Sequence, residues 1–196
     1  MSAIAALLAG CSQISFSPPA MYSSKAMNEL TADLKKISEK YNIEEVRVHE
    51  KDKLSNEFGM AVVLMRDSEG EKFEQILYYN IGIPHNDPKP NDYREYYHKG
   101  MKKEPNFVNV DDIIKQKDNI EKYVEDAIAQ IGEEYYFKSV TDLTFTADDE
   151  KDLQIQFKVN VTKKGQSERR EGGRMVTDYY ELKFTVDTDG NVIYKK

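Results

Sequence analysis

The chain has 196 residues, 39% apolar and 32% charged, which suits a well-solvated fold of one ordinary domain or of two small ones that share a core. Its formal net charge of −7 disfavours nucleic-acid binding, because affinity for phosphate depends on clustered Lys and Arg. A single cysteine excludes an internal disulfide, and no run of residues approaches the roughly 20 apolar positions that span a bilayer.

The chain begins with a short apolar run of small residues that ends at its single cysteine, Cys11. Such a run is similar to the end of a bacterial secretory signal peptide. More narrowly, Leu8-Ala9-Gly10-Cys11 resembles the lipobox of bacterial lipoproteins. The resemblance implies that residues 1–10 are a signal peptide remnant and that Cys11 is acylated and inserted in a lipid bilayer. The alternative is an apolar tail with an incidental cysteine, since no Lys or Arg precedes the run.

Residues 11–24 are uncharged, rich in Ser and contain the pair Pro18-Pro19, a composition that predicts a lipidated tether. Two or three acyl chains hold a protein stably on a membrane, so the predicted location is the cell envelope. Ser12, directly after the cysteine, resembles the residue found in lipoproteins that are forwarded to the outer membrane. In a Gram-negative cell the outer membrane is therefore favoured over the inner one.

Residues 25–81 predict a helix followed by antiparallel strands. From Lys25 to Tyr41, apolar residues recur at spacings of three and four, which places them on one helical face. Strands are expected at 46–48, 58–64 and 73–81, with a turn at 67–70 between the last two.

Residues 82–110 are expected to form a long loop that holds four of the six prolines. Loops of this length are usually either functional or disordered. Tyr93, Tyr96 and Tyr97 are candidate binding residues, because tyrosine is favoured at binding surfaces. The alternative is that these rings belong to a short helix packed on the sheet.

Residues 111–196 predict a second helix followed by a four-stranded meander. Asp111 is expected to cap a helix that ends at Gly132. Strands are expected at 136–145, 153–161, 176–186 and 192–194, and residues 153–161 alternate strictly between apolar and polar. The predicted fold class is α+β, with two helix-then-antiparallel-meander units whose helices pack on antiparallel sheet.

The end of this second half, from Tyr179 to Ile193, resembles secreted PepSY-like modules. In those modules a helix and a meander close on a similar Asp-Gly hairpin, and the modules are thought to act as inhibitors or binding domains. The resemblance implies a binding or inhibitor role for the body of this chain.

No catalytic residue, cofactor or metal site is predicted, because no nucleophile, phosphate-loop or metal motif is present in the sequence. Paired carboxylates occur at predicted caps and turns, where solvated acids are expected. The spacing of His85, Asp87 and His98 fits no standard zinc site. Asp187 to Asn191 starts like a calcium loop but lacks the glutamate that such a loop needs at its twelfth position.

Residues 163–174 are expected to form a basic hairpin tip on an otherwise acidic protein. Arg169 and Arg170 are candidate binding residues there, for lipid headgroups or an acidic partner. The alternative is a solvated loop without a function.

These features together predict a cell-envelope lipoprotein whose body is a non-catalytic binding or inhibitor module with a protein partner in the envelope. The alternative is a structural subunit of an envelope assembly, and an enzyme is the least favoured class.

Overall fold

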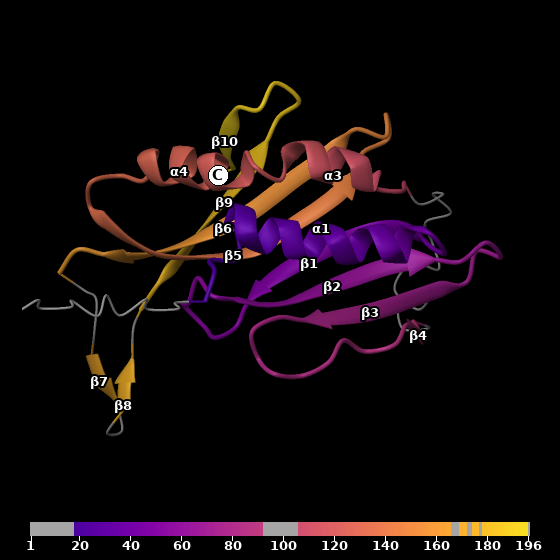
Figure 1. Ribbon diagram of the computed structural model, residues 1–196. Helices are drawn as coiled ribbons and strands as arrows, with labels where there is room; N and C mark the ends of the chain where they lie inside the picture. The colour runs from indigo at the N-terminus through magenta and orange to yellow at the C-terminus, as the bar shows by residue number, and fades with distance from the viewer. Residues whose placement is uncertain (1–17, 92–105, 166–168, 172–173, 177, 196) are drawn as a thin grey trace, which may run out of the picture.

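A computed structural model describes residues 18–91, 106–165, 169–171, 174–176 and 178–195. Within these ranges, three helices lie on one side of an eight-stranded antiparallel sheet (Figure 1). The helices are α1 (Ser24–Ser38), α3 (Val110–Gln116) and α4 (Ile120–Ala129). The predicted α+β class is thus confirmed. No helix in the described ranges has the length and apolar character needed to cross a membrane.

The order of the strands across the sheet is β10-β9-β6-β5-β1-β2-β3-β4. Every neighbouring pair is antiparallel, and the pairing of β1 with β5 joins the first half of the chain to the second. The bounds are β1 (Asn42–Glu50), β2 (Phe58–Arg66), β3 (Lys72–Tyr78), β4 (Lys89–Pro90), β5 (Tyr135–Ala147), β6 (Leu153–Lys163), β9 (Tyr180–Val186) and β10 (Val192–Lys195). A separate two-stranded ladder is formed by β7 (Arg169–Glu171) and β8 (Arg174–Val176).

Three turns lie at one end of the sheet and share one hydrogen-bonding pattern. They connect β2 to β3, β5 to β6 and β9 to β10, and they begin at Asp67, Asp148 and Asp187. In each turn the aspartate Oδ1 accepts from the backbone N–H groups two and four residues further on, at 2.7–3.0 Å. The residue three positions after each aspartate has a left-handed φ of 68–86°. We call this end the turn end; the opposite end holds the starts of β2, β5 and β9.

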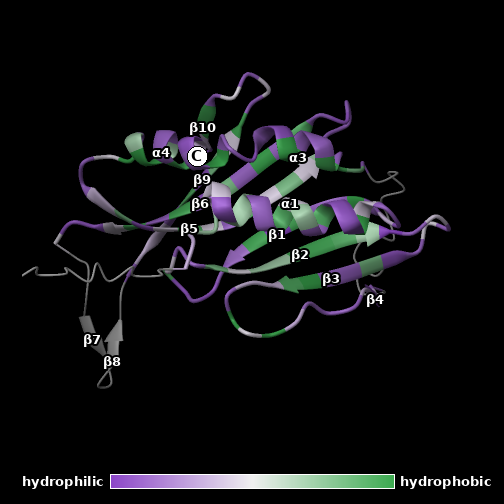
Figure 2. Ribbon diagram, viewed as in Figure 1, coloured by the Kyte–Doolittle hydropathy of each residue, from purple (hydrophilic) through white to green (hydrophobic). Residues whose placement is uncertain are grey.

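Helix α1 forms because its apolar residues repeat on one face, as the sequence predicts. Met27, Leu30 and Leu34 are fully buried on this face. They belong to a core that also contains Val63 of β2 and Phe145 of β5. Figure 2 shows apolar and polar residues mixed along α1, whereas β2 is mostly apolar. The helices therefore cover the core, and among the described residues no helix lies on the other face of the sheet, which we call the helix-free face.

The predicted helix from Asp111 to Gly132 is in fact two helices, and its cap is elsewhere. The side chain of Asn109, with an extended backbone, accepts from the N–H of Asp111 and caps α3. Asp111 instead lies in the first turn, where its charge favours the helix dipole. Helix α3 ends at Gln116, and α4 begins after the polar residues 117–119.

The two central strands are longer than predicted. Strand β1 covers Asn42–Glu50, although only 46–48 alternates clearly. The acidic residues before Val46 interrupt the alternation of apolar and polar residues in the sequence. In the sheet, Glu44 forms an ion pair with Arg66 on the neighbouring strand β2. Strand β5 contains two irregularities in its pairing with β6, which also disturb the alternation in its sequence.

The predicted single strand 176–186 is wrong. Residues up to Val176 belong to β8, which pairs only with β7, and β9 starts at Tyr180. The partner β6 pairs with β9 no further than Val161 opposite Tyr180, although β6 itself continues to Lys163.

Both segments expected to be irregular contribute to the body. In the segment 82–110, β4 adds a short edge strand to β3, and Val108 is buried while its N–H donates to Ile43. In the predicted tether 11–24, Met21 is fully buried and donates to the backbone of Asn56. Residues 18–24 of the predicted tether 11–24 therefore belong to the folded body.

Candidate functional site on the helix-free face

The helix-free face of the sheet carries a row of polar side chains across its centre. Cross-strand partners lie on the same face of a sheet, and one row joins Arg47 to Thr144, Gln156 and Thr185. Arg47 also pairs with Val62 of β2, where this face becomes apolar. The polar row therefore belongs to β1, β5, β6 and β9.

A β-bulge in β5 introduces a carboxylate into this row. Two residues, Asp142 and Leu143, lie opposite the single residue Phe157 of β6. Asp142 has a φ of 51°, in the left-handed region that aspartate tolerates better than most residues. A β-bulge often changes the direction in which a side chain points. Here Leu143 remains in the core, whereas the Asp142 carboxylate contacts Lys158.

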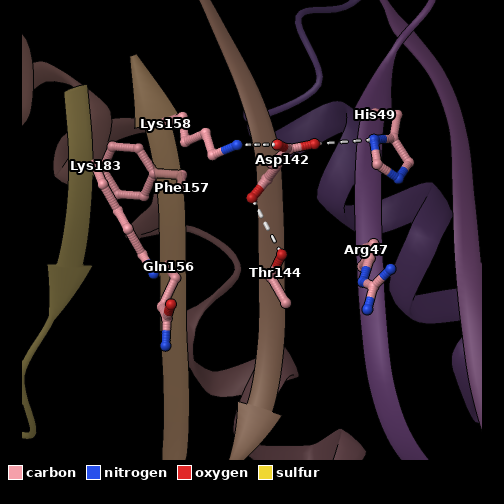
Figure 3. Close-up of a pocket in the computed structure, with 8 residues that line it drawn as sticks. All are labelled: Arg47, His49, Asp142, Thr144, Gln156, Phe157, Lys158 and Lys183. Atoms are coloured by element: carbon pink, nitrogen blue, oxygen red, sulfur yellow. Dashed lines mark hydrogen bonds and ion pairs between the residues drawn. The ribbon is translucent and has the colours of Figure 1, made fainter. Parts of the chain in front are cut away.

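The Asp142 carboxylate contacts basic side chains on both sides. Its Oδ1 lies 3.3 Å from Nδ1 of His49, and its Oδ2 lies 2.8 Å from Nζ of Lys158. The Lys158 ammonium also lies 3.3 Å from Oε2 of Glu181, so the network crosses four strands. Figure 3 shows the contacts of Asp142 with His49 and Lys158. The hydrogen bond with Asp142 raises the pKa of Lys158 and keeps it charged.

Around this network the surface forms a hollow of about 260 Å³, which we call the cationic hollow. Its lining contains four basic side chains and one acidic one: Arg47, His49, Lys158 and Lys183 with Asp142, together with Thr144, Gln156 and Phe157. Arg47 is paired with Glu45. Within the described residues Lys183 forms no ion pair, and its side chain is exposed.

The arrangement suits recognition by charge and hydrogen bonding. His49 offers its Nε2, but among the described residues no hydroxyl or thiol is bonded to it. The nearest hydroxyl in the hollow, on Thr144, donates to the carbonyl of Asp142 within the same bulge. A nucleophile next to a base is thus not assembled in the described part of the hollow.

A second polar cluster fastens the segment after β3 to α1. The hydroxyl of Tyr79 donates to Oδ2 of Asp33 at 3.1 Å, and Nε2 of His85 lies 3.1 Å from the same oxygen. Because Nδ1 of His85 accepts from the N–H of Tyr78, Nε2 carries the proton and donates to Asp33. Burial alone would raise the pKa of Asp33, but hydrogen bonds from Lys36, Tyr79 and His85 outweigh it and lower the pKa.

The structure places the predicted candidates in different ways. Cys11, Tyr93, Tyr96, Tyr97 and His98 lie outside the described residues. Arg169 and Arg170 lie in β7, in a ladder separate from the sheet that forms the hollow. His85 contacts Asp33, and no group of three or more metal-binding side chains exists among the residues that the structure describes.

The sequence reasoning missed the cationic hollow. Its residues come from strands that are far apart in sequence, and each charge taken alone looks like an ordinary polar position in an alternating strand. The pairing of β1 with β5 brings them together, and that pairing leaves no local signal. The one available sign was the departure of residues 142–143 from alternation, which is typical of a bulge.

Comparison with known proteins gives no match to a family model, to a curated protein or to a solved structure.

Proposed function

We propose that this chain is a cell-envelope lipoprotein whose body is a non-catalytic binding module. Acylated Cys11 anchors it in the bilayer, and the cationic hollow on the helix-free face contacts a protein partner in the envelope. The lipobox at residues 8–11 supports the anchor, and the geometry of the hollow supports the binding role.

The hollow is the observation that carries the binding role. Four basic side chains gather on a protein with a net charge of −7, and three of them come from different strands of one rigid sheet. Exposed Lys183 and Arg47, with Gln156 between them, offer donors to a carboxylate-rich segment of a partner. An acidic ligand on an acidic protein would be repelled elsewhere on the surface, so the hollow also confers specificity.

The two-unit arrangement belongs to the same proposal. In this view α1 with β1–β3 and α3–α4 with β5, β6, β9 and β10 are similar units whose first strands pair at the centre of the sheet. The hollow then lies across the seam between the units, which is a common place for a binding site.

The test is site-specific photo-crosslinking in intact cells. A photoreactive amino acid replaces Gln156 in the hollow, and a matched variant carries it at Glu121 on the exposed side of α4. We expect one envelope protein to be captured through residue 156 and not through residue 121.

The variant Lys183→Glu reverses the charge of a lining residue that forms no ion pair within the described part of the chain, and it should reduce that capture at least tenfold. Lys122→Glu on α4 makes the same charge change away from the hollow and should leave capture unchanged. Equal capture from positions 156 and 121, or equal effects of the two charge reversals, would contradict the binding role of the hollow.

A further inference from the structure

A row of lysines crosses the helix-free face next to the β10 edge of the sheet. Lys195 of β10 is directly opposite Lys183 of β9, and Lys183 is directly opposite Lys158 of β6. Directly opposite side chains lie on the same face with their β-carbons about 5 Å apart, and like charges in this position destabilise a sheet. The row lies on the helix-free face, because Lys158 contacts Asp142 there.

Of these lysines, Lys158 is neutralised by its neighbours. Its ammonium contacts Asp142 at 2.8 Å and Glu181 at 3.3 Å. Within the described residues neither Lys183 nor Lys195 forms an ion pair, and both side chains are exposed. Towards the turn end the next acidic residue after Lys183 is Asp187, whose carboxylate already accepts from Asn191. Lys183 and Lys195 therefore leave a local excess of positive charge.

The opposite edge of the sheet is built differently. There Lys89 of β4 is exposed and lies directly opposite Glu74 of β3, an arrangement of opposite charges that stabilises a strand pair. Lysine on an edge strand is common, because it hinders pairing with other chains. The unusual feature of β10 is therefore that its lysine faces a second lysine.

The β10 edge is accessible to a ligand through its side chains. Gln130 of α4 donates from Nε2 to the carbonyl of Val192 at 3.0 Å, and β10 has only four residues (Figure 1). An added strand would have to displace Gln130 to pair along β10. Ile193, opposite Thr185 and thus on the lysine face, is 40% exposed and offers an apolar contact beside the lysines.

The lysines continue into the cationic hollow. From Lys195 on β10 to Arg47 on β1 there are four strand spacings, or roughly 19 Å, and Lys183 and Gln156 of the hollow lie between them. An extended chain covers that distance with about six residues. Because the positive charges are spread over this length, a ligand with several carboxylates contacts more of them than one small anion does.

We infer that Lys183 and Lys195 form a lysine clamp, which directs a carboxylate-rich segment of the partner across the strands from the β10 edge into the cationic hollow. The inference rests on the proposed function of the hollow. One carboxylate of the segment lies between the two ammonium groups and relieves their repulsion. The residues that follow it reach Gln156 and Arg47.

The test measures peptide binding to the full chain by isothermal titration calorimetry at low salt. The probe is hexaglutamate with both ends blocked, and blocked hexaglutamine is the uncharged control. Hexaglutamate should bind and hexaglutamine should not. Lys183→Glu and Lys195→Glu should each weaken hexaglutamate binding by about fivefold or more, the loss expected for one exposed ion pair. Lys89→Glu makes the same charge change on the opposite edge strand and should leave binding unchanged.

Melting temperatures of the free proteins separate loss of the clamp from misfolding. Lys195→Glu replaces a pair of like charges by a pair of opposite charges, so it should raise the melting temperature by about 1–4 °C. Lys89→Glu places a second carboxylate opposite Glu74 and should lower it. A variant that is more stable and binds more weakly has not lost binding through unfolding.

The inference is overturned if wild type does not bind hexaglutamate, if Lys195→Glu binds it as wild type does, or if Lys89→Glu weakens binding equally. A melting temperature that does not rise in Lys195→Glu overturns it too, because the two lysines would then not repel each other. Displacement of the peptide by inorganic phosphate at the same total charge would show that one small anion suffices. Lys195 does not line the hollow, so crosslinking through residue 156 judges the proposed function separately.

Discussion

Asp142 combines an unusual backbone conformation with a bridging charge, and substitutions can separate the two contributions. Its φ of 51° lies in the left-handed region. An ordinary residue loses about 1–2 kcal/mol there, because its β-carbon comes too close to the following carbonyl oxygen. Its carboxylate pairs with His49 and Lys158, and exposed pairs of this kind contribute up to about 1 kcal/mol each. We expect the bulge to be stable because aspartate tolerates the left-handed φ and also supplies the carboxylate for the two ion pairs.

Three variants give a ranked outcome. Asp142→Ala loses both ion pairs, and alanine tolerates the left-handed φ less well than aspartate does. The variant should therefore lower the free energy of unfolding by about 2–3 kcal/mol. Asp142→Gly loses the pairs and relieves the strain, but glycine adds about 0.4–1 kcal/mol of entropy to the unfolded chain, and the net loss should be about 1–2 kcal/mol. Asp142→Asn tolerates the left-handed region and loses only the charge, which should cost about 1 kcal/mol.

The measurement is urea unfolding followed by far-UV circular dichroism, with equal slopes required in all four proteins. The order of stability should be wild type, Asn, Gly and then Ala. If Ala is as stable as Gly, the left-handed conformation costs alanine no more than the entropy that glycine adds to the unfolded chain, about 0.4–1 kcal/mol, and the expected 1–2 kcal/mol is wrong. If Asn equals wild type, the contacts with His49 and Lys158 contribute no stability.

Three further predictions concern the core, one carboxylate and the anchor. Phe157 is 1% exposed and stacks on Phe184 at 5.8 Å, so Phe157→Ala should cost about 3–5 kcal/mol in urea unfolding. Its neighbour Lys158 is on the helix-free face, and Lys158→Ala should cost no more than about 1 kcal/mol; similar losses would mean that the two faces of β6 are misassigned. Asp33 has a folded-state pKa below its usual 3.8, so the stability it adds is present above that pH and is lost as the pH falls through the folded pKa. Asp33→Asn should therefore be less stable than wild type at pH 6, and the difference should shrink as the pH falls below 3.8; a difference that does not change with pH would assign the loss to packing. Cys11→Ala should abolish metabolic labelling with palmitate and release the protein from membranes, whereas labelling that survives in this variant would end the anchor hypothesis.

The sequence predicted those elements whose signal is local. Residues 153–161 alternate because one face of β6 lies in the core, and the alternation was sufficient to locate the strand. The three-and-four spacing around Leu30 likewise located α1 to within a few residues. In both cases one face of a continuous segment is buried, so its apolar residues recur at a regular spacing in the sequence.

Elements that depend on distant partners were not predictable in this way. Strand β9 begins only at Tyr180, opposite Val161 of β6, and α3 is capped by Asn109, whose backbone is extended. The cationic hollow depends on the register between β1 and β5, which are separated by more than 80 residues.

The central pairing of β1 with β5 also has a consequence for how the chain is made. During synthesis α1, β1, β2 and β3 emerge first, and β1 then presents an unpaired edge until β5 is complete at Ala147. At 5–20 residues per second this takes on the order of 5–20 s, during which the edge can pair with other chains and aggregate. The first half of the chain therefore exposes one edge of its sheet throughout this interval, because the partner strand of β1 is encoded far downstream.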